Sequence, residues 1–134
     1  MEQQTAAIRF ALFSNALLSA AVGLLLALGG SSVSSWLGLS IAGWLQLLGV
    51  ALVGHAIALV LAAARRDRSR WARVNLALIA PYPLLMIALV AFGVVTRPLG
   101  VALVLLDAAA VGVMAYLHLS GLRQAPSVVH APSA

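Results

Sequence analysis

The sequence contains no cysteine, which excludes disulfide bonds, thiol redox chemistry and cysteine-ligated metal sites. It also contains no lysine, because all eight of its basic residues are arginine. Charged residues of both signs make up only 8% of the chain, whereas a soluble domain carries roughly a quarter. A water-facing surface cannot be built from so few charges. The composition therefore excludes an ordinary soluble globular domain.

Hydrophobic residues make up 63% of the 134 residues, and the mean hydropathy is +1.09. About 20 apolar residues are enough for a helix to cross the hydrocarbon core of a bilayer. The apolar runs predict four such spans, at about residues 6–29, 41–64, 74–95 and 99–122. The predicted fold is an all-α, integral membrane four-helix bundle of two successive hairpins, forming one domain over residues 1–123. Residues 124–134 are rich in Pro, Ser and Ala and predict a disordered cytoplasmic tail.

Chain breakers and small residues predict how these spans end, bend and pack. The first apolar run is too long for a signal peptide, which predicts a retained helix that ends at residues 29–32, Gly-Gly-Ser-Ser. Pro81 and Pro83 remove two backbone donors from the third span and predict a helix kink there. Small residues at every fourth position predict close helix contacts. Such rows are Ser19, Gly23 and Ala27; Gly54, Ala58 and Ala62; and Ala108 and Gly112.

Five of the eight arginines are concentrated between the second and third spans. They are Arg65, Arg66, Arg68, Arg70 and Arg73. Four spans place this segment on the same side of the membrane as Arg9 and Arg123, and only Arg97 on the other side. Seven arginines against one predict that both termini are cytoplasmic. We interpret the segment as a topology anchor that also attracts anionic lipid headgroups. No nucleic-acid partner is predicted, because the loop has no fold around it to hold one.

Asp107 is the one acidic residue within a predicted span. A carboxylate near the centre of a transmembrane helix costs about 2.5 to 3.5 kcal/mol on insertion, so it must face the bundle. Gln46 lies at similar depth in the second span and is the predicted hydrogen-bond partner. Two interpretations stay open. Asp107 either protonates in order to bind a cation or relay a proton, or it locks the fourth helix to a neighbour.

Asn15, His55 and Tyr82 fall at nearly the same depth on the first three spans. They either line a mid-membrane pocket beside the kink or form interhelical hydrogen bonds worth about 0.6 kcal/mol each. The spacing of the three histidines predicts no metal site. There is no Ser/His/Asp set in register, no pair of carboxylates and no nucleotide-binding motif. The sequence therefore predicts no enzyme activity and no cofactor.

Several short motifs resemble those of a widespread, uncharacterised group of small bacterial inner-membrane proteins with four transmembrane helices. They are Asn15-Ala16 with Ser19 and Gly23, Trp36-Leu37-Gly38-Leu39, Leu48-Gly49-Val50-Ala51-Leu52, Gly100-Val101-Ala102-Leu103 and Gly121-Leu122-Arg123. The third span departs from the group at Ala80-Pro81-Tyr82-Pro83. The resemblance implies the four-span fold and a bacterial inner membrane, and it supplies no activity.

Three functions follow as hypotheses. The first is a non-enzymatic helix-packing module in the lipid bilayer that self-associates as a homo-oligomer or accompanies a partner membrane protein. The alternative is an oligomeric, proton-linked transporter or channel for a small solute, with Asp107 titrating and Asn15, His55 and Tyr82 lining the path. The third, an enzyme that acts on lipid, has the least support because the catalytic residues are missing.

Overall fold

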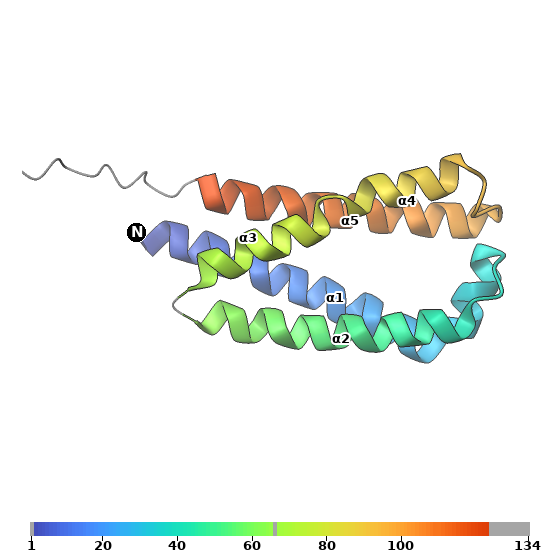
Figure 1. Cartoon of the computed structure of the whole chain (residues 1–134), viewed down its shortest axis with the longest axis horizontal. Helices are drawn as coiled ribbons and strands as arrows, with labels where there is room; N and C mark the ends of the chain where they lie inside the picture. The colour runs from blue at the N-terminus through green and yellow to red at the C-terminus, as the bar shows by residue number, and fades with distance from the viewer. Residues whose placement is uncertain (1, 66, 124–134) are drawn as a thin grey trace, which may run out of the picture.

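The computed structural model of the protein describes residues 2–65 and 67–123 (Figure 1). The predicted tail and Arg66 lie outside these residues. The described chain forms α1 (Glu2–Leu37), α2 (Ala42–Ala64), α3 (Arg68–Ile79), α4 (Tyr82–Ala91) and α5 (Pro98–Arg123). Four segments are long and apolar enough to cross a membrane, and α3 and α4 together make the third. The predicted all-α bundle with four possible spans is confirmed.

The first helix does not end where the sequence predicts, because α1 continues to Leu37. Gly29 has non-helical angles, φ −108° and ψ 16°, and produces a kink inside the helix. Gly30 then lies against α2, where a Cβ would be 2.7 Å from Cγ of Gln46. In lipid, helical hydrogen bonding is the least costly state of the backbone, so a glycine pair bends the helix without ending it. The kink allows the last turns of α1 to reach α5.

The third span also begins earlier than predicted, at Arg68, so three of the arginines assigned to a loop lie in the first turns of α3. The predicted kink in this span is confirmed, because α3 ends at Ile79 and α4 begins at Tyr82. Proline has no backbone N–H, so Pro81 and Pro83 cannot donate to the carbonyls one turn before them. Helical bonding resumes with the Leu85 N–H donating to the Pro81 carbonyl, at 3.1 Å.

Glycines hold α1 close to α2 over the middle of both helices. A Cβ on Gly23 would lie 2.8 Å from the Gly49 carbonyl oxygen, and a Cβ on Gly49 would lie 2.6 Å from the Gly23 carbonyl oxygen and even closer to the Ala27 backbone. The predicted close-packing face of the first span is thus confirmed. The row on α2 is split, because Ala62 is buried whereas Gly54 and Ala58 are exposed. Ala108 is buried, and Gly112 on α5 faces Pro83 on α4.

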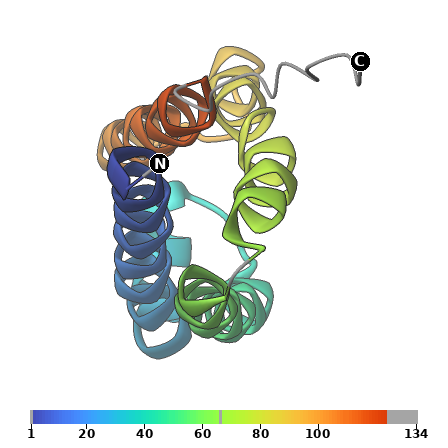
Figure 2. The same cartoon turned by 90° about the vertical axis from the view of Figure 1, so that its left-hand side faces the viewer.

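The helices lie around a ring in which α1 contacts α2, α3 and α5 (Figure 2). Buried hydrophobic residues form two separate clusters. One joins α1, α2 and α3 near the end where Arg9, Arg65 and Arg123 lie, which we call the arginine end. The other joins the far ends of α1 and α2 to Val95 and to the start of α5.

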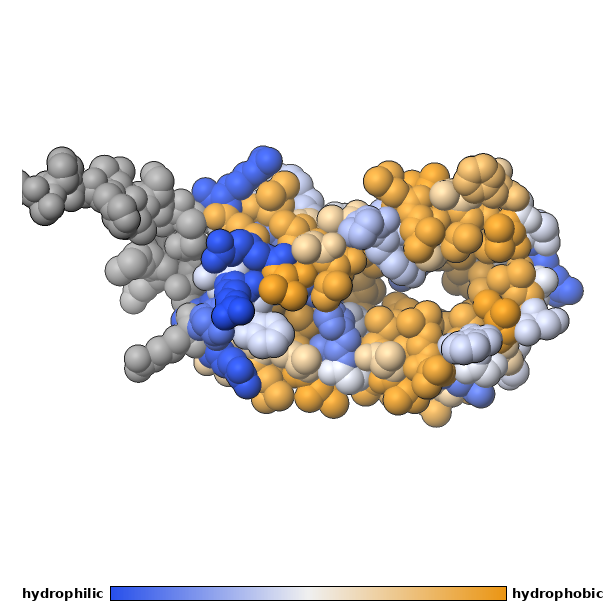
Figure 3. Space-filling view, viewed as in Figure 1, coloured by the Kyte–Doolittle hydropathy of each residue, from blue (hydrophilic) through white to orange (hydrophobic). Residues whose placement is uncertain are grey.

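Among the described helices, α4 contacts only α3 and α5, and α2 contacts only α1 and α3. Between α2 and α4 the molecule is therefore open, and Figure 3 shows a gap between the α4–α5 pair and the α1–α2 pair in the half away from the arginine end. We call this gap the lateral opening. The surface around it is mostly hydrophobic, and hydrophilic residues gather at the arginine end (Figure 3). This distribution fits a chain that crosses a bilayer with its two ends at the surfaces.

Candidate functional site

Asp107 on α5 accepts a hydrogen bond from α4, the helix that follows the kink. The Tyr82 hydroxyl donates a hydrogen bond to Asp107 Oδ2 at 2.5 Å. Tyr82 is the first residue of α4, and the break before it lets α4 follow α5, with Pro83 packed at Gly112. Both side chains are only partly buried. The pair is therefore a polar group in the middle of the third and fourth spans that the fold shields incompletely.

The predicted bond between Gln46 and Asp107 is wrong. Gln46 lies on α2, and within the described chain α2 makes no contact with α5. Its side chain is exposed, with the stem against Gly30 of α1. Gly100 of α5 packs against Leu37 at the end of α1, seven residues beyond the contact of Gly30 with Gln46.

Asn15, His55 and Tyr82 do not come together in one contact set. Asn15 is 3% exposed on α1, and His55 is partly buried on α2. Tyr82 lies on α4, which touches neither of those helices in the described structure. The predicted polar pocket of these three side chains is therefore not formed by direct contact. Tyr82 instead belongs with Asp107.

A buried polar pair that the sequence reasoning missed joins α3 to α5. Asn75 Nδ2 lies 2.9 Å from His118 Nε2, and His118 Nδ1 lies 2.8 Å from the Met114 carbonyl oxygen. The amide nitrogen can only donate and the carbonyl can only accept, so His118 is a neutral imidazole that carries its proton on Nδ1. Asn75 is 2% exposed and His118 is 1% exposed. The sequence contained a signal for this pair. Asn75 and His118 both lie within about two helical turns of the arginine end, so they are at similar depth on the third and fourth spans.

Two buried polar atoms have no hydrogen-bond partner among the described residues. They are the donor Nδ2 of Asn15 and the acceptor Oδ1 of Asn75. Leaving such an atom unpaired costs about 1 to 3 kcal/mol. Asn15 therefore contributes little to holding the bundle together, whereas Asn75 still bonds His118 with its other amide atom.

Two hydrogen-bonded polar pairs of the described residues, Tyr82–Asp107 and Asn75–His118, each join two helices. The described residues contain no group of three or more His, Asp or Glu side chains that could hold a metal ion. No family model, curated protein or solved structure matches this chain. The site therefore has to be interpreted from its own geometry. Its accessible polar groups are the partly buried Tyr82–Asp107 pair and the exposed side chain of Gln46.

Proposed function

We propose that the protein is a non-enzymatic membrane assembly module in which two copies associate, α2 of each copy lying in the lateral opening of the other. The observation that carries this proposal is that α2 and α5, whose residues Gln46 and Asp107 the sequence predicts to lie at similar depth, make no contact within the described chain. The proposed setting is a bacterial inner membrane with both termini cytoplasmic. The gathering of six described arginines at one end supports that orientation. They are Arg9, Arg65, Arg68, Arg70, Arg73 and Arg123.

The uncovered face of α2 suits a helix contact. Gly43, Gln46, Val50 and Gly54 follow one another at helical spacing, and all four are exposed. A Cβ added at Gly43 or Gly54 would meet nothing within 4 Å, so another helix can approach the backbone closely there. The exposed amide of Gln46 in this face is unfavourable in lipid unless it finds a polar partner.

Asp107 supplies such a partner. A carboxylate can accept several hydrogen bonds, and in this structure Tyr82 donates to one of its oxygens. Two copies inserted in the same direction are related by a two-fold axis along the membrane normal, which preserves depth. With the depths that the sequence predicts, Gln46 of each copy is then level with Asp107 of the other. The dimer contains this hydrogen bond twice and covers the face of α4, where no described residue is buried.

Association should depend on Gly54. In the cysteine-free chain, a single Val50→Cys substitution is expected to give disulfide-linked dimers in liposomes under oxidising conditions. Adding Gly54→Leu should abolish most of the cross-linking, because the larger side chain fills the space that a second copy needs. Gln46→Leu should weaken association about threefold to tenfold, as expected for losing an interhelical hydrogen bond.

The control is Leu28→Phe, since Leu28 is 83% exposed on α1 and lies outside the proposed contact. Open space at Gly54 means that Gly54→Leu should keep the helical content and the unfolding transition of the parent chain. Cross-linking of the Val50→Cys chain that is absent, or that is equally efficient when Leu is also present at position 54, rules out this dimer.

The second candidate function is a proton-linked transporter, and the incompletely shielded Tyr82–Asp107 pair beside the helix break favours it. Its test is Asp107→Asn in proteoliposomes with an internal pH indicator. A transporter should lose all proton-linked flux in this variant, because asparagine cannot titrate, while the dimer persists, because asparagine still accepts a hydrogen bond. If the parent protein carries no proton flux with any tested solute, the module is the better description.

A further inference from the structure

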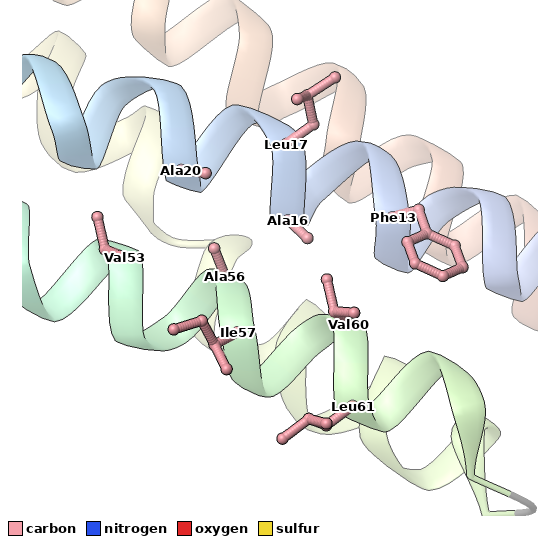
Figure 4. A pocket seen from close by; sticks show the side chains of 9 residues that line it. All are labelled: Phe13, Ala16, Leu17, Ala20, Val53, Ala56, Ile57, Val60 and Leu61. Atoms are coloured by element: carbon pink, nitrogen blue, oxygen red, sulfur yellow. The ribbon is translucent and has the colours of Figure 1, made fainter.

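A groove of about 440 Å³ runs between α1 and α2 on the side of the arginine end (Figure 4). Every residue that lines it is apolar. Ala16 and Ala56 are buried and form its floor, whereas Phe13, Val60 and Leu61 are exposed and form its walls. The groove exists because the glycine contact that joins the two helices lies farther along, at Gly23 and Gly49, and alanine is too small to fill the space beyond it.

Two arginines stand at the end of this groove. Arg9 precedes Phe13 by one helical turn, and residues 9, 13, 16 and 20 follow at helical spacing on one face of α1. Arg65 follows Leu61 by one turn at the end of α2. Both arginines are exposed. One arginine on each of the two helices that form the walls therefore lies a helical turn beyond the groove, toward the arginine end.

We infer that this groove binds one anionic phospholipid, with an acyl chain between α1 and α2 and the phosphate between Arg9 and Arg65. Charge complementarity selects this occupant. A guanidinium group binds a phosphate through paired hydrogen bonds, and anionic headgroups lie at this depth. The groove lies nearer the arginine end than the Gly43–Gly54 segment of α2 and is lined by none of the four residues of the proposed contact, so its test does not require the dimer.

The test is native mass spectrometry of the full chain in detergent, titrated with phosphatidylglycerol or with phosphatidylcholine of the same acyl chains. We expect one phosphatidylglycerol to bind at least tenfold more tightly than phosphatidylcholine. The double variant Arg9→Gln with Arg65→Gln should lose about tenfold in phosphatidylglycerol affinity. The matched control, Arg73→Gln with Arg123→Gln, removes the same charge from the same end and should change the affinity less than threefold.

The acyl-chain half of the site is tested by filling the groove. Ala20→Leu, at a partly buried lining position, should weaken binding of both lipids, whereas Ala21→Leu, at an exposed position of α1 outside the lining, should not. If the two arginine double variants lose equal amounts of phosphatidylglycerol affinity, the lipid is attracted by the general positive charge of this end, and the proposed site is overturned. If Ala20→Leu binds both lipids as tightly as the unchanged protein, the acyl chain does not lie in the groove. If Ala20→Leu does not fold, the arginine comparison still decides the proposal.

Discussion

Replacing Gly49 by alanine should lower the free energy of unfolding by about 3 kcal/mol, the upper part of the range for overpacked interiors. The added Cβ would lie 2.6 Å from the Gly23 carbonyl oxygen and would also press on the backbone of Ala27. Both obstacles are main-chain atoms of α1, so no side chain can rotate away. The clash is relieved only by separating α1 from α2, the helix pair with the most extensive contact among the described helices.

The matched control is Gly54→Ala, five residues later on the same helix. A Cβ there meets nothing within 4 Å in the same chain, so in the dissociated monomer only the intrinsic helix preference for alanine changes, by about 1 kcal/mol or less in the stabilising direction. Reversible unfolding in mixed micelles, followed by circular dichroism, measures both variants. Equal stabilities for the two would show that α1 and α2 do not approach each other at Gly49 as described.

The contrast between these glycines shows what the sequence could and could not predict. Spacing of small residues correctly indicated a close contact for Gly23, but the same signal at Gly54 and Ala58 marks an exposed face. Four-residue spacing identifies a face of a helix and does not say which helix covers it, or whether one does. The same reason explains the error over Gln46. Counting residues placed it level with Asp107, but depth carries no information on which helices are neighbours.

The predicted end of the first helix was wrong for a different reason. The sequence rule that glycine and serine end a helix rests on water, which can satisfy the freed backbone groups. In a bilayer that alternative is missing, so α1 passes Gly29 with only a kink. The four spans themselves were predictable because hydropathy over about 20 residues depends only on the local sequence. The kink at Pro81 was predictable too, since a missing N–H is a property of the residue alone.

The buried pair of Asn75 and His118 should show the second large effect. Asn75→Leu removes the donor to His118 Nε2 and leaves that nitrogen buried without a partner, which costs about 2 kcal/mol of unfolding free energy. Asn15→Leu should do the opposite. Its Nδ2 has no partner among the described residues, so an apolar side chain of similar size removes an unpaired donor and should raise stability by about 1 kcal/mol.

A double-mutant cycle separates the hydrogen bond from packing. His118→Leu alone should be as costly as Asn75→Leu, because the Asn75 amide then loses its partner. With both residues replaced by leucine, neither buried atom is left unpaired, and the loss should be smaller than either single loss. Unfolding in mixed micelles gives the four free energies. If the two single losses simply add, the two side chains do not interact, and α3 is held against α5 by its apolar contacts alone.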